Sequence, residues 1–97
     1  MDAAHKIVWS PSAKYDFRGA FESIARDNLY AANEWRDSIL NHIQKLATFP
    51  TLGRIIPQIG HPRYRELIVG EYRIFHEVTE KAVVILRIFH SKRLFPI

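Results

Sequence analysis

The sequence contains no cysteine, which excludes disulfide-stapled scaffolds and thiolate metal sites. Glycine and proline are sparse, with four and five residues among 97, so collagen-like and low-complexity chains are excluded as well. No apolar run approaches the ~20 residues that a membrane-spanning helix needs, and the first residues lack the apolar stretch of a signal peptide. We therefore expect a soluble, cytoplasmic protein with no membrane partner, folded as a single domain over residues 1–97.

Positive charge is distributed unevenly along the chain. The 14 Lys and Arg residues exceed the 10 Asp and Glu residues by four. Residues 1–53 hold six of each sign, so the whole excess lies in residues 54–97, where arginine predominates. Arginine suits bidentate contact with carboxylate or phosphate. The excess indicates either a solvated basic face or, more specifically, a surface for an anionic partner.

Two helices are predicted by apolar residues that recur at three- and four-residue spacing. The first covers about residues 11–26, after a Ser10-Pro11 start signal. The second begins after residues 27–28 and ends near Ala47 or Thr48, because a proline follows at position 50. A short apolar run at residues 7–9 precedes both helices and predicts a first strand.

The apolar period shortens after residue 62 and predicts three strands, at residues 64–69, 72–78 and 82–89. The last strand is almost continuously apolar, which is typical of a central strand buried on both faces. Strict alternation along it puts Val83 and Ile85 on the face opposite Ile88. The sequence thus predicts an α+β fold in the order β-α-α-β-β-β. An antiparallel helical hairpin covers one face of a mainly antiparallel, twisted sheet, and the other face is free for function.

Arg73 lies inside a predicted strand between apolar residues, so it is not a casual surface charge. Its structural interpretation is a salt bridge to Glu66 or Glu77. His90 ends the last strand, close to further basic residues, and could transfer a proton or contact phosphate. The alternative is that His90 bonds to backbone and that the basic residues after it form a solvated tail.

Motifs for other chemistry are absent from the sequence. It has no zinc-protease motif, no glycine-rich phosphate loop and no serine nucleophile elbow, and its five histidines are scattered. We therefore expect no metal and no cofactor. Neither predicted helix carries a basic face, which disfavours a DNA-recognition helix.

Three segments, in order, resemble the ParE branch of the RelE/ParE toxin superfamily. They are residues 46–54 (LATFPTLGR), 65–78 (RELIVGEYRIFHEV) and 84–93 (VILRIFHSKR). The resemblance spans Ile7 to Arg93, and the predicted element order is also that of this family. It implies the toxin of a type II toxin–antitoxin module, whose antitoxin wraps the toxin with a segment that folds on binding.

The resemblance leaves two targets open. ParE-like members inhibit DNA gyrase without an enzymatic step, whereas RelE-like members cut ribosome-bound mRNA, and the shared fold cannot separate them. The PxxGR and HxxR elements favour ParE, and Ser91 stands where ribonuclease members often have tyrosine. We expect gyrase inhibition, with an mRNA endoribonuclease as the enzymatic alternative and a non-toxic interaction module as the third.

The basic residues of the second half are the candidate site residues. A target-binding surface would include Arg65, Arg73, His90, Lys92 and Arg93. If the protein were a ribonuclease, the catalytic candidates would be Arg54, Arg65, Arg73 and His90. We expect the antitoxin, acidic and amphipathic, to bind the arginine-rich sheet face and the uncovered sheet edges.

Overall fold

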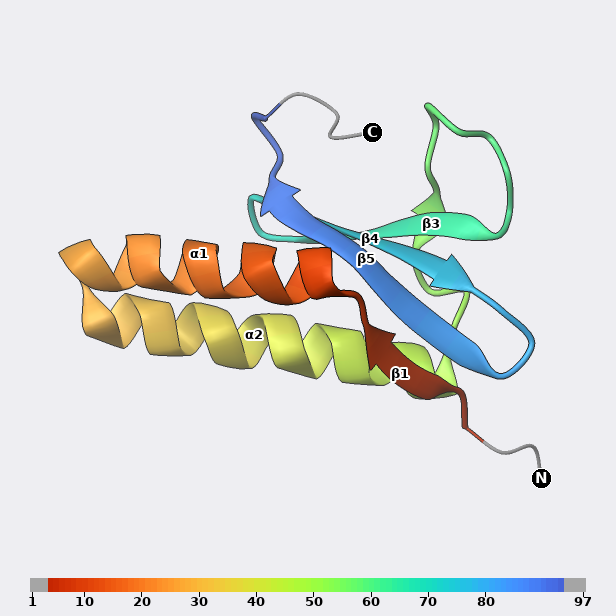
Figure 1. Ribbon diagram of the computed structural model, residues 1–97, viewed down its shortest axis with the longest axis horizontal. Helices are drawn as coiled ribbons and strands as arrows, with labels where there is room; N and C mark the ends of the chain where they lie inside the picture. Colours follow the sequence, from red (N-terminus) through yellow and green to blue (C-terminus); the bar gives the residue numbers. More distant parts are fainter. Residues whose placement is uncertain (1–3, 94–97) are drawn as a thin grey trace.

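The predicted α+β order is confirmed by the computed structural model, which describes residues 4–93 (Figure 1). The elements are β1 (Lys6–Trp9), α1 (Pro11–Asp27), α2 (Leu29–Thr48), β2 (Arg54–Ile55), β3 (Tyr64–Val69), β4 (Tyr72–Val78) and β5 (Ala82–His90). They form one sheet in the order β1-β5-β4-β3-β2, in which β1 runs parallel to β5 and the other pairs are antiparallel. Neither helix within the described residues is long and apolar enough to cross a membrane.

A single residue, Asn28, connects the two helices of the hairpin. Its backbone N–H donates to the Ile24 carbonyl at the end of α1 (2.9 Å), and its side-chain oxygen accepts from the Ala31 N–H at the start of α2 (3.0 Å). At the other end of α1, the Ser10 hydroxyl accepts from the Ala13 N–H (3.0 Å), as its position before proline predicts. One residue that ends one helix and begins the next forces the helices to fold back side by side (Figure 1).

The main core lies between the hairpin and the sheet. Its buried members come from both helices and from β3, β4 and β5, and include Ile39, Leu46, Ile74 and Ile85. A chain of aromatic rings runs through this layer, with successive centroids 5.1–5.3 Å apart, from Trp9 through Phe17 and Trp35 to Tyr72. On the opposite face of the sheet a smaller cluster is built from Ile56, Phe75 and Phe89.

A β-bulge changes the phase of β5, so the expectation of strict alternation is wrong. Phe75 pairs with Arg87, but the next residue of β4, His76, pairs with Ile85, which leaves one extra residue on β5. Ile85 and Ile88 therefore both point into the helix-side core. Alternation along β5 cannot reveal the shift, because every β5 residue near the bulge except Arg87 is apolar.

Strand β2 was not expected from the sequence. It has only two residues, and it pairs antiparallel with β3 through Arg54–Glu66 and Ile55–Arg65. Two residues are too few to show an alternating pattern. This short strand nevertheless places Arg54 beside Glu66.

Helix α1 completes the edge of the sheet beyond the end of β1. Ser10 donates from its N–H to the Ile85 carbonyl and from its hydroxyl to the Leu86 carbonyl, both at 2.9 Å. Further along, the Asp16 carboxylate accepts the Ile88 N–H (3.0 Å) and two bonds from the Arg87 guanidinium (2.7 and 3.0 Å). Ser10 and Asp16 thus take the place of the missing strand and pair with the Ile85 and Leu86 carbonyls and the Ile88 N–H of β5.

Candidate functional site

The candidate site residues fall into two separate groups. Tyr72 pairs with His90, and Arg73 pairs with Phe89 on the same two strands. Because successive residues of a strand face opposite sides, the side chains of Arg73 and His90 lie on opposite faces of the sheet. The structure therefore does not bring these two ribonuclease candidates together.

The first group surrounds the carboxylate of Glu66. This side chain is buried, with 1% of the residue exposed, and it accepts hydrogen bonds from Arg54 Nε (2.7 Å) and from Arg73. The Arg73 guanidinium carbon also lies 4.9 Å from the ring centre of Phe75 and 5.4 Å from that of Phe89. The salt bridge to Glu66 is thus confirmed, and the charge of Arg73 is satisfied within the protein.

Arg65 holds the loop before β3. Its Nε donates to the Pro62 carbonyl (3.0 Å) and its Nη1 to the Gly53 carbonyl (3.1 Å). Gly53 lies so close to the sheet that a Cβ would stand 2.6 Å from the Glu66 carbonyl oxygen and 2.8 Å from Cε1 of His76. The glycine of the PxxGR element is therefore a packing requirement. The two bonds of Arg65 join the α2–β2 connection, at Gly53, to the β2–β3 loop, at Pro62.

His76 is fully buried beneath this loop. Its Nδ1 donates to the Ile74 carbonyl (3.1 Å), while Nε2 has no hydrogen-bond partner among the described residues. Burial lowers the pKa of His76, the bond to Ile74 opposes that shift, and the charge of Arg65 adds to the lowering. The ring is a neutral core residue, since a proton on Nε2 would have no acceptor.

The second group lies at the end of β5. Nε2 of His90 faces Oε2 of Glu71 at 3.3 Å, and Nδ1 accepts the backbone N–H of Lys92 at 3.1 Å. Since Nδ1 is the acceptor, Nε2 carries the proton and donates it to Glu71. Both imidazole nitrogens thus form hydrogen bonds within the protein. The expected backbone bond of His90 is observed.

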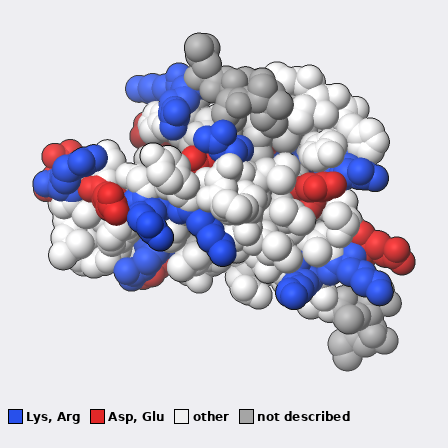
Figure 2. All heavy atoms as spheres, viewed as in Figure 1, with Lys and Arg blue, Asp and Glu red and all other residues white. Residues whose placement is uncertain are grey.

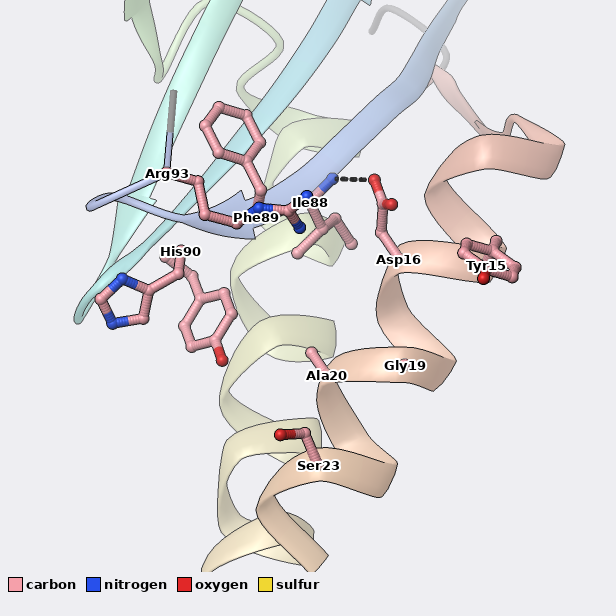
Figure 3. A pocket seen from close by; sticks show the side chains of 10 residues that line it. Tyr15, Asp16, Gly19, Ala20, Ser23, Ile88, Phe89, His90 and Arg93 are labelled. Atoms are coloured by element: carbon pink, nitrogen blue, oxygen red, sulfur yellow. Dashed lines mark hydrogen bonds between the residues drawn. The ribbon is translucent and has the colours of Figure 1, made fainter. Parts of the chain in front are cut away.

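His90 and Arg93 line a hollow of about 260 Å³ between α1 and the end of β5 (Figure 3). The small residues Gly19, Ala20 and Ser23 of α1 form its opposite wall. Asp16 also lines the hollow, but its carboxylate is bound to β5. Arg93, which is exposed, supplies the free charge.

Lys92 is exposed in the turn after β5 and stands beside this second group. Sequence reasoning did not single out Asp16, Glu71 or Tyr72 as site residues, because their roles depend on contacts between distant segments. Among residues 4–93, no three His, Asp or Glu side chains gather as a set of metal ligands.

A groove runs along the outer surface of the helical hairpin. It consists of two hollows, of about 350 and 270 Å³, that share Phe17 and Arg18 as lining residues. Its apolar lining is Trp9, Phe17, Phe21 and Leu40, and its basic lining is Lys14, Arg18 and Arg36. Basic side chains gather over the middle of the hairpin in Figure 2. Lys14 and Arg18 form no ion pair with any described residue.

Comparison with known proteins gives one family and two similar structures. The family model described as "ParE toxin of type II toxin-antitoxin system, parDE" matches residues 7–95. The chromosomal ParDE toxin–antitoxin system from P. aeruginosa contains a chain with a TM-score of 0.75 and 18% identity, over 92% of this chain and 98% of that one. The toxin–antitoxin complex RelBE2 from Mycobacterium tuberculosis contains a chain with a TM-score of 0.58 and 20% identity, over 90% of this chain and 98% of that one. No curated protein matches the sequence.

Proposed function

This chain belongs to the ParE toxin family of type II toxin–antitoxin systems, and on that premise we propose that it inhibits DNA gyrase without an enzymatic step of its own. The match over residues 7–95 carries the proposal, because it covers both helices and every strand except the first residue of β1. The proposed place of action is the cytoplasm, where gyrase works on DNA. A cognate antitoxin holds the toxin inactive.

The geometry of the two basic groups supports gyrase inhibition over RNA cleavage. Cleavage of a phosphodiester needs a group that can take or give a proton and a cation beside the phosphate. Both nitrogens of His90 are engaged, and Arg73 is paired with Glu66 on the other face of the sheet. The ribonuclease candidates are thus separated and occupied by internal contacts.

The surface proposed to contact gyrase is the end of β5, comprising His90, Lys92 and Arg93. Of the basic candidates, Lys92 and Arg93 have exposed side chains that form no ion pair with a described residue. Arg65 and Arg73 were also expected at this surface, but Arg65 donates to the Pro62 and Gly53 carbonyls and Arg73 donates to Glu66. The proposal therefore assigns direct contact to the β5 end.

The hairpin groove is the proposed docking surface for the antitoxin. It is an apolar floor between basic side chains, which fits an amphipathic segment with acidic residues along its borders. The open sheet face is less suited to this role, because Arg54 and Arg73 already share the Glu66 carboxylate. The toxin thus presents separate surfaces to antitoxin and target.

A supercoiling assay with purified toxin and gyrase tests the proposal. Toxin in excess over gyrase should abolish supercoiling, and added antitoxin should restore it. The charge-reversed variant Lys92→Glu/Arg93→Glu should inhibit at least ~10-fold less, about 1.4 kcal/mol of lost binding. Lys81→Glu, which reverses an exposed lysine in the β4–β5 turn, is the matched control and should inhibit as the parent does. Undiminished supercoiling at toxin excess contradicts the proposal.

A further inference from the structure

A second hollow lies on the other side of His90 from the one beside α1. It has a volume of about 570 Å³ and lies between the first half of α2 and the β3–β4 turn. Tyr72 and His90 line both hollows and form the ridge between them. The gyrase proposal uses His90 but none of the other residues that line this second hollow.

Its walls carry negative charge and no positive charge. Glu34 lines it from α2, and Glu71 lines it from the β3–β4 turn, whereas none of the described Lys and Arg residues does. That is unusual in a chain with 14 basic and 10 acidic residues. Glu34 forms no ion pair with any described residue. Glu71 contacts the imidazole of His90 at 3.3 Å and pairs with no described lysine or arginine.

Aromatic rings line the hollow beside the two carboxylates. Trp35 and Tyr72 pack edge to face with their centroids 5.1 Å apart, and both line it. The pKa of Tyr72 is raised, mainly by burial and further by the charge of Glu71, which is consistent with a negative potential there. Carboxylates together with aromatic rings are the combination by which proteins bind guanidinium and ammonium groups.

We propose that this hollow receives a basic side chain, arginine or lysine, presented by a partner protein. The volume admits such a side chain together with part of its main chain. The Glu34 and Glu71 carboxylates would pair with the cation from opposite walls, and Trp35 and Tyr72 would contact its apolar stem. A divalent metal is a poorer occupant, since no three ligating side chains gather anywhere in residues 4–93.

Titration of the ¹⁵N-labelled protein with argininamide tests this site without gyrase or antitoxin. The indole N–H of Trp35 reports on the hollow, and that of Trp9, which lines the hairpin groove instead, is the internal control. Argininamide should shift the Trp35 resonance saturably and leave Trp9 in place. Citrullinamide, which has nearly the same shape but no charge, should bind at least ~10-fold more weakly.

Two variants decide whether the carboxylates are responsible. Glu34→Gln and Glu34→Gln/Glu71→Gln should weaken argininamide binding stepwise, whereas Glu22→Gln, which neutralises an exposed carboxylate of α1 outside the hollow, should not. Equal shifts with argininamide and citrullinamide, or an unchanged response in the double variant, would overturn the proposal. The same Trp35 shift with Mg²⁺ at matched ionic strength would also overturn it, in favour of a metal site.

Discussion

Glu66 and Arg73 form an ion pair in which the carboxylate side chain is fully buried and the guanidinium side chain is 13% exposed. Breaking a buried pair by removing one partner leaves an uncompensated charge and typically costs about 3–5 kcal/mol. Arg54 contacts the same carboxylate, but its side chain is 60% exposed. The two arginines therefore differ in their expected contribution to stability.

Replacement of each arginine by alanine tests this difference. Arg73→Ala should lower the free energy of unfolding by about 3–5 kcal/mol, because Glu66 would keep only a solvent-exposed partner. Arg54→Ala should cost about 1 kcal/mol or less, because the Arg54 side chain is largely exposed and Glu66 would keep its pair with Arg73. Urea unfolding followed by circular dichroism measures both. Equal losses of unfolding free energy in the two variants would show that the burial of Arg73 does not increase its contribution to stability.

Two glycines should respond to alanine in opposite directions. Gly53→Ala should destabilise the fold by about 1–3 kcal/mol, because its Cβ would stand 2.6 Å from the Glu66 carbonyl oxygen. Gly19 lies inside α1, where an added Cβ would meet no atom within 4 Å beyond the helix's own backbone, so Gly19→Ala should stabilise by about 0.5–1 kcal/mol. Thermal melts of the two variants show directly whether each substitution raises or lowers the melting temperature. A Gly53→Ala variant as stable as the parent would contradict the close approach.

His76 predicts a dependence of stability on acid. Its pKa is lowered in the folded protein by burial, so below the unfolded-state pKa of about 6.5 the unfolded chain binds a proton that the native chain does not. Stability should fall as the pH drops below that value, with a slope of up to about 1.4 kcal/mol per pH unit for this one group. The loss ends once the pH passes the lowered folded-state pKa.

The variant His76→Leu isolates this group. Unfolding measured between neutral pH and the onset of acid denaturation should be less pH-dependent in His76→Leu than in the parent. His61→Gln, a change at an exposed histidine, should keep the parent's slope. If His76→Leu has the same acid dependence as the parent, another group is responsible.

Charge in the hairpin groove should govern antitoxin association. Association between the basic groove and an acidic segment should slow markedly as salt rises from low to physiological ionic strength. Lys14→Glu/Arg18→Glu should slow association and flatten this salt dependence, whereas Lys81→Glu on the β4–β5 turn should change neither. Stopped-flow measurements of toxin–antitoxin binding give both quantities. An association rate of the parent that does not depend on salt would show that the charge of the groove does not steer antitoxin binding.

Sequence patterns predicted the helices and the three longer strands, since each has a clear period and a recognisable start or end. Ser10 and Pro11 begin α1, and the helix bounds differ from expectation by a residue or two. The salt bridge of Arg73 was also anticipated, because a charge inside an apolar strand needs a nearby partner. These features are local, and local sequence determines them.

The features that the sequence could not supply depend on distant segments. The bulge in β5 arises where β4 and β5 pair, and it sets which residues face the helices. Asp16 pairs with Arg87, 71 residues further along the chain, and no local pattern connects them. The separation of Arg73 from His90 has the same origin, because it follows from strand pairing. The sequence therefore named candidate residues for a surface but could not predict how they are arranged.

Gyrase inhibition without an enzymatic step can be distinguished from RNA cleavage by identifying the polymer that is cut when the toxin acts. Purified toxin is added to gyrase with plasmid DNA and, in parallel, to ribosomes programmed with an mRNA. We expect gyrase-cleaved, linear plasmid to accumulate while the mRNA stays full length. Truncated mRNA with a fully supercoiled plasmid would contradict gyrase inhibition and support the ribonuclease alternative.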